Sequence, residues 1–161
     1  MKAGTVFDCM VFVQAIASRG PAFRCYQQVT GAGTPLLIST DTLRELRSVL
    51  NRPELQRKLP GITPERVEAM MHHLADLAVV VQPVPTHLAF PPDPKDEPYI
   101  NLAIEGRAGS LVTRDRALLR LSNASEPLSV CLRALNPILR VLEPEAFLSL
   151  DETPPTAHNF R

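Results

Sequence analysis

The chain has 161 residues, with 17 Lys and Arg balanced by 17 Asp and Glu, so its formal net charge is zero. This charge argues against a strongly basic nucleic-acid binder, and the length fits one domain with a hydrophobic core of its own. The three cysteines (Cys9, Cys25 and Cys131) form no CxxC or CxxH pair, so no zinc site is expected and we interpret them as reduced residues of a cytoplasmic protein. No signal peptide is apparent and no run reaches about 18 apolar residues, so we expect no membrane association.

Short apolar runs alternate with stretches of helical periodicity, which predicts strands and helices in turn. Predicted strands cover residues 3–7, 36–39, 77–82, 110–113 and 138–142. Predicted helices cover 9–17, about 21–30, 42–50 (with Thr40 or Asp41 as its N-cap), 53–59, 63–74, a helix from Pro98 to Gly106, 116–121, and a last one that begins at Pro144. Residues 122–136 are compatible with either strand or helix, and a proline-rich loop covers 83–94.

This alternation predicts an α/β fold, a three-layer α/β/α arrangement with a mainly parallel sheet of four or five strands. We expect a single domain over residues 1–150. The polar segment 151–161, which contains Pro154 and Pro155, is expected to be a flexible tail.

Acidic residues stand where predicted strands end and helices begin. Asp8 follows the first strand and Asp115 follows the fourth. Asp96 and Glu97 precede the helix that leads into the fourth strand, and Glu45 lies in the helix after the second strand. Because the carboxyl ends of parallel strands meet at one edge of a sheet, we expect these carboxylates to converge there.

Converging carboxylates repel one another at neutral pH unless a positive charge compensates. Mg²⁺ and Mn²⁺ prefer carboxylate and water oxygens, and such ions activate water for displacement at phosphorus. The pattern therefore points to metal-dependent hydrolysis of a phosphodiester. A simpler interpretation also exists for each residue: Asp8 and Asp115 as helix caps, and Glu45 as a solvated surface acid.

The order of these residues resembles the PIN-domain family of metal-dependent ribonucleases, and within it the toxin components of toxin–antitoxin pairs. Each matching piece is weak alone, but all five occur in the family's order over most of residues 3–150. The pieces are Thr-Val-Phe-Asp8, Leu-Ile-Ser39 with Leu-Arg-Glu45-Leu and Val-Leu-Asn-Arg-Pro53, Asp93-Pro-Lys-Asp96-Glu97-Pro, Leu-Val-Thr113-Arg-Asp115, and Leu-Glu-Pro-Glu-Ala-Phe-Leu148.

The resemblance implies single-stranded RNA as substrate, Mg²⁺ or Mn²⁺ as cofactor, a small antitoxin as a partner, and a homodimer. It also implies the site residues by position. The metal ligands, which would carry catalysis, are Asp8, Glu45, Asp96 or Glu97, and Asp115; Ser39 and Thr113 would be supporting hydroxyls.

Two positions depart from the family's usual pattern. Met10 stands where the first motif usually has Asn, and Glu97 stands where Asp is common. These departures favour a second hypothesis, a PIN scaffold that binds RNA or a protein partner without cleavage. A third hypothesis, a phosphatase-like hydrolase with an Asp nucleophile, lacks the expected Asp-x-Asp pair after the first strand.

Overall fold

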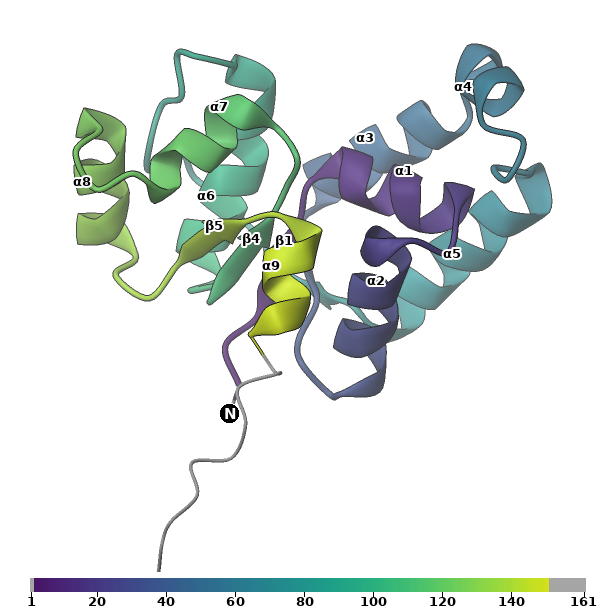
Figure 1. The fold of residues 1–161 in the computed structure, drawn as a ribbon, viewed down its shortest axis with the longest axis horizontal. Coiled ribbons are helices and arrows are strands. Elements are labelled where there is room, and N and C mark those ends of the chain that lie inside the picture. Colours follow the sequence, from purple (N-terminus) through teal and green to yellow (C-terminus); the bar gives the residue numbers. More distant parts are fainter. Residues whose placement is uncertain (1, 151–161) are drawn as a thin grey trace, which may run out of the picture.

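Five short parallel strands run through the middle of the molecule, whose computed structural model describes residues 2–150 (Figure 1). The strands are β1 (Thr5–Phe7), β2 (Leu37–Ile38), β3 (Val79–Val80), β4 (Ser110–Val112) and β5 (Arg140–Leu142). β1, β4 and β5 form one sheet in the order β1-β4-β5, and β2 pairs with β3. An isolated parallel bridge between Thr5 and Leu36 places β2 beside β1, so the spatial order is β3-β2-β1-β4-β5.

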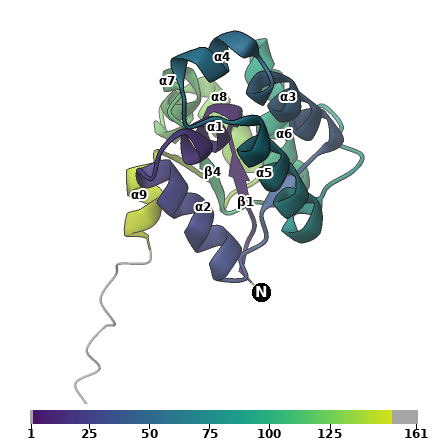
Figure 2. The ribbon, with the colours of Figure 1, turned by 90° about the vertical axis from the view of Figure 1, so that its right-hand side faces the viewer.

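Helices cover both faces of this sheet, as the alternation of elements predicts. In Figure 1, α1, α2, α3 and α5 lie on one side of the strands and α6, α7 and α8 on the other; Figure 2 looks from the side of α1, α2, α3 and α5, with α7 and α8 fainter behind. The helices are α1 (Cys9–Ala17), α2 (Pro21–Gly31), α3 (Thr40–Leu50), α4 (Pro53–Lys58), α5 (Pro64–Leu77), α6 (Glu97–Glu105), α7 (Arg116–Leu119), α8 (Pro127–Leu135) and α9 (Pro144–Ser149), with 3-10 turns η1 (Pro94–Asp96) and η2 (Arg120–Ser122). The predicted three-layer α/β/α class is confirmed.

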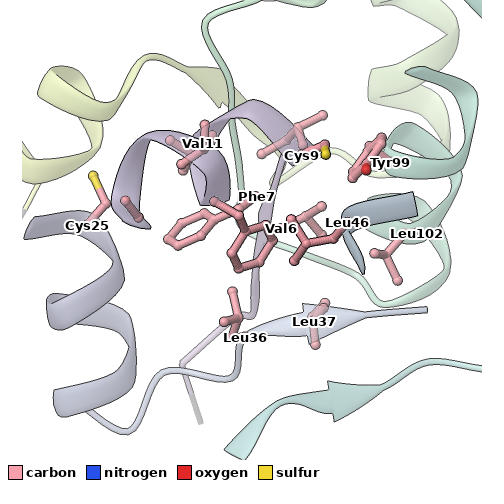
Figure 3. Close-up of a cluster of buried hydrophobic side chains, with 14 of the residues drawn as sticks. Val6, Phe7, Cys9, Val11, Cys25, Leu36, Leu37, Leu46, Tyr99 and Leu102 are labelled. Carbon is pink, nitrogen blue, oxygen red and sulfur yellow. The ribbon is translucent and has the colours of Figure 1, made fainter. Parts of the chain in front are cut away.

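The centre of the hydrophobic core lies around β1, all three residues of which are buried. Figure 3 shows Val6 and Phe7 among side chains from α1, β2 and α3. Phe7 meets Phe12 and Phe147 edge to face, with ring centroids 5.4 and 6.3 Å apart, an arrangement that aromatic rings prefer. β1 is therefore fixed on both faces, and the position of the residue that follows it, Asp8, is fixed with it.

The structure corrects two local predictions and resolves a third segment that the sequence leaves open. The N-cap of α3 is Ser39, whose side chain accepts from the Thr42 N–H, and not Thr40 or Asp41. α5 continues to Leu77, so the strand predicted over 77–82 shrinks to the exposed pair Val79–Val80 at the edge of the sheet. Residues 122–136, which the sequence leaves open, contain α8. The tail predicted over 151–161 lies outside the described residues, and none of the described helices is long and apolar enough to cross a membrane.

The buried side chain of Asn136 joins α8 to the turn between α6 and β4. Its Nδ2 donates to the carbonyl oxygens of Ala103 and Ala108 at 3.0 and 2.9 Å. Asn136→Ala leaves both buried carbonyls without this donor, so we expect the free energy of unfolding in urea to fall by about 1–3 kcal/mol. The control Asn51→Ala removes one exposed bond, to the Arg47 carbonyl, and should cost about 0.5 kcal/mol or less. Equal losses in the two variants would contradict the role given to Asn136.

Candidate functional site

Asp8 is held at the carboxyl end of β1 by the last residue of β4 and the residue that follows it. Its N–H donates to the Val112 carbonyl at 3.0 Å, which continues the parallel pairing one residue past the strand. Its Oδ2 accepts a 2.8 Å hydrogen bond from the Thr113 hydroxyl. The side chain is buried, and burial raises the pKa of Asp8, while the hydrogen bond from Thr113 opposes that shift. Asp8 occupies the N-cap position of α1 without a side-chain cap hydrogen bond of normal geometry.

Thr113 also positions Asp115. The Thr113 Oγ1 accepts the Asp115 N–H at 2.9 Å, so one buried hydroxyl contacts both acidic segments. The Asp115 Oδ1 accepts the N–H groups of Ala117 and Leu118 at 2.8 and 3.3 Å and thereby caps α7. Because the cap uses Oδ1 alone, Asp115 can be a helix cap and still offer its second oxygen to a ligand.

Asp96 supplies the most unusual atom of the site. Its Oδ2 is buried and has no hydrogen-bond partner among the described residues. Burial, together with the charges of Asp115, Asp8, Asp93 and Glu45, raises the pKa of Asp96 to about 7. Carboxylate oxygens of Asp93, Asp96 and Asp115 lie within 4.8 Å of one another. A buried carboxylate oxygen of this kind costs free energy unless a cation or proton satisfies it.

Glu45 approaches Asp8 from α3, which lies on the side of the sheet opposite α6 (Figure 1). Its carboxyl is half-buried, and burial together with the Asp8 charge raises its pKa, against the lowering effect of the Tyr99 hydroxyl and of Arg52 and Lys95. The Tyr99 hydroxyl is buried without a hydrogen bond of normal geometry and faces Glu45 and Cys9; Figure 3 shows Tyr99 beside Cys9. Burial, together with the charges of Glu45 and Asp8, raises the pKa of the Cys9 thiol to about 12, so this thiol stays protonated at neutral pH.

The structure thus brings Asp8, Glu45, Asp96 and Asp115 together and turns two other predicted residues elsewhere. The Glu97 Oε1 accepts the Phe90 N–H at 2.8 Å. Ser39 exchanges hydrogen bonds with Thr42 as the cap of α3. Glu97 and Ser39 line a separate small pocket.

Two residues near these carboxylates were not predicted as site residues. Asp93 is the N-cap of η1 and stands three residues before Asp96, a spacing that puts two side chains on one face of a helical turn. Tyr99 follows two residues after Glu97, and its hydrophobic character alone predicts a core residue. In the sequence, Asp93 is indicated by the Asp93-Pro94 pair, since a cap followed by a proline is typical of a helix start.

The donor set fits a hard divalent cation. It consists of carboxylate oxygens, which Mg²⁺, Mn²⁺ and Ca²⁺ prefer, and contains no available thiolate or imidazole. Carboxylate oxygens of Asp93, Asp96 and Asp115 lie within 4.8 Å of one another. Two oxygens on opposite sides of one such ion are separated by a comparable distance, about 4 to 5 Å. The orphaned Asp96 Oδ2 is the observation that most directly favours a cation at this place.

A family model described as PIN domain matches residues 4–117, which is most of the chain. The chain therefore belongs to the PIN-domain family, and the resemblance seen in its motifs is confirmed. PIN domains are generally nucleases and usually use divalent metal ions, in agreement with the acidic cluster. Searches among curated proteins and among solved structures found no match.

The raised pKa of Asp96 predicts how pH affects the stability of the metal-free protein. Its pKa in the folded state is about 7 against 3.8 for the ordinary group, so the folded state holds a proton that the unfolded state releases. The free energy of unfolding therefore falls as pH rises from about 4 through 7. Urea unfolding in EDTA at pH 5 and pH 8 should show this loss, and Asp96→Asn should make it smaller. Asp41→Asn, at an exposed acid, should retain the wild-type loss. An equal pH dependence in wild type and Asp96→Asn would contradict this assignment.

Proposed function

We propose that this protein is a Mg²⁺- or Mn²⁺-dependent endoribonuclease that hydrolyses phosphodiester bonds of single-stranded RNA. The observation that supports the proposal best is the buried, unpartnered Oδ2 of Asp96, whose carboxylate lies within 4.8 Å of an Asp115 oxygen and has its pKa raised by burial and by the charges of Asp115 and Asp8. Such an arrangement is unfavourable without a cation. The family to which the chain belongs generally cuts nucleic acid, and a cation held by these carboxylates would serve that reaction.

Each side chain has a distinct task in this mechanism. Asp8, Asp96 and Asp115 would hold the divalent ion, which when bound supplies an activated water and neutralises charge on the phosphate. Thr113 holds the Asp8 carboxylate and the Asp115 backbone, and the cap on α7 holds the Asp115 carboxylate, so little reorganisation is needed when substrate arrives. Glu45 is half-buried beside Asp8 and is suited to orient the attacking water or to accept its proton.

Exposed cations next to the carboxylates are suited to contact the RNA backbone. Arg52 and Lys95 both act on the Glu45 charge, and Arg116 follows Asp115 directly; all three are exposed. Arg114 is unsuited, because its guanidinium already contacts Gln14 and makes a two-point ion pair with Glu145 at 3.1 and 2.7 Å. Few free cations and a net charge of zero together predict a weak dependence of RNA binding on salt.

The biological setting of this activity follows from the resemblance to toxin components. We propose that the protein acts in the cytoplasm as the toxin of a toxin–antitoxin pair, that a small antitoxin blocks the carboxylates, and that the toxin is a homodimer. A short reading frame next to the gene would support the pairing with an antitoxin.

A second candidate function is RNA or protein binding without cleavage. Met10 favours it, because this side chain is 45% exposed near the start of α1, two residues after Asp8. A methionine there provides an apolar surface and only a weak hydrogen-bond acceptor for a water or a phosphate.

Cleavage of labelled single-stranded RNA in Mn²⁺ or Mg²⁺ distinguishes the two candidates. Asp8→Asn and Asp115→Asn keep the size of each side chain but remove the charge, so each should lower the rate at least about 100-fold. Asp41→Asn, at an exposed acid paired with Arg44, should cut like the wild type. If the wild type binds RNA without cutting it and binds no metal in calorimetry, the nuclease proposal is wrong and the binding scaffold is favoured.

A further inference from the structure

Two polar side chains of α6 hold the loop that connects β3 to η1. The Asn101 Oδ1 accepts the N–H groups of His87 and Leu88 at 2.8 and 2.9 Å, and its Nδ2 donates to the Leu88 carbonyl at 3.1 Å. One turn earlier on the helix, the Glu97 Oε1 accepts the Phe90 N–H. Asn101 and Phe90 are both almost fully buried, so these bonds fix the loop against α6.

This arrangement gives Glu97 a different task from that of a metal ligand. Its carboxylate is the acceptor for the backbone of Phe90, whose side chain is 1% exposed. Turning Glu97 toward Asp96 would withdraw that acceptor and release the end of the loop just before Asp93.

The loop delivers another carboxylate to the site. Asp93 is the N-cap of η1, and its Oδ1 accepts the Lys95 N–H at 3.1 Å. A carboxylate oxygen of Asp93 lies within 4.8 Å of oxygens on Asp96 and Asp115. The Oδ2 of Asp96, a side chain that is 93% buried, has no hydrogen-bond partner in the same cluster, so this cluster offers a cation an atom that nothing else in the described chain satisfies.

We propose that Asp93 is a metal ligand in this protein and that Glu97 is a positioning residue that holds the loop carrying Asp93. The two metal ligands near the start of α6 are therefore Asp93 and Asp96, which both precede the helix. This inference rests on the proposed metal-dependent function, since it assigns ligands within the same site.

Mn²⁺ binding to the purified full-length protein tests the assignment without measuring activity. Asp93→Asn retains an oxygen for the Lys95 N–H but loses the charge, so it should weaken Mn²⁺ binding at least about tenfold, as should the positive control Asp96→Asn. Glu97→Gln retains a carbonyl oxygen for the Phe90 N–H and should bind Mn²⁺ within about twofold of the wild type. Free Mn²⁺ is counted by electron paramagnetic resonance, and circular dichroism checks that each variant is folded.

A second measurement follows the loop itself in the metal-free protein. Glu97→Ala removes the acceptor, so amide hydrogen exchange at Phe90 should become faster, whereas Asp93→Asn should leave it unchanged. If the wild type binds no Mn²⁺, the metal-dependent function fails and this assignment fails with it. If the wild type binds Mn²⁺ but Glu97→Gln weakens binding as much as Asp96→Asn does, or Asp93→Asn does not weaken it, the assignment is wrong while the metal site stands.

Discussion

The hydroxyl of Thr113 is the contact on which the geometry of the site depends most. It donates to the carboxylate of Asp8 and accepts the N–H of Asp115, so it joins two acidic segments that lie 105 residues apart along the chain from Asp8 to Thr113. The register of the sheet makes this possible, because Phe7 pairs with Val112 and each strand ends at the same level. Since Thr113 is fully buried, neither the Asp8 carboxylate nor the backbone of Asp115 can move without disturbing the core.

The fold brings together more carboxylates at this edge of the sheet than the neighbouring cations compensate. Asp96 and Glu45 reach the edge from helices on opposite sides of the sheet, and burial together with the neighbouring carboxylates raises the pKa of each. The cations near the site are exposed, so they screen the carboxylates from the solvent side only. A protein normally avoids such an arrangement, and its position at the carboxyl edge of a parallel sheet is the physical reason for the cation site that we propose there.

The features of the structure that the sequence predicts correctly are those that depend on local pattern and on parallel topology. α1 covers the residues predicted for it, and the family and the fold class are confirmed. That Asp8 and Asp115 meet follows from strand ends alone, since parallel pairing leaves them no other place. Their role as metal ligands stays a prediction.

Other features depend on contacts that no local pattern contains. Asp96 and Glu97 are adjacent, and only the hydrogen bond from Phe90, in a loop before them, directs Glu97 away from the carboxylates. Likewise, the exposed character of β3 results from its edge position, which depends on the order of all five strands. The cap of α3 was misplaced for a smaller reason: Ser39, Thr40 and Asp41 are all good caps, and the end of β2 selects among them.

Crystals of the protein grown with Mn²⁺, with anomalous differences measured near the manganese absorption edge, test the central claim most directly. We expect an anomalous peak within coordination distance of carboxylate oxygens of Asp96 and Asp115, at the edge that Thr113 organises, with Glu97 still bound to the Phe90 N–H. A structure with no peak at this edge at millimolar Mn²⁺, and with the carboxylates of Asp8, Glu45, Asp96 and Asp115 in the same positions, would contradict the metal site.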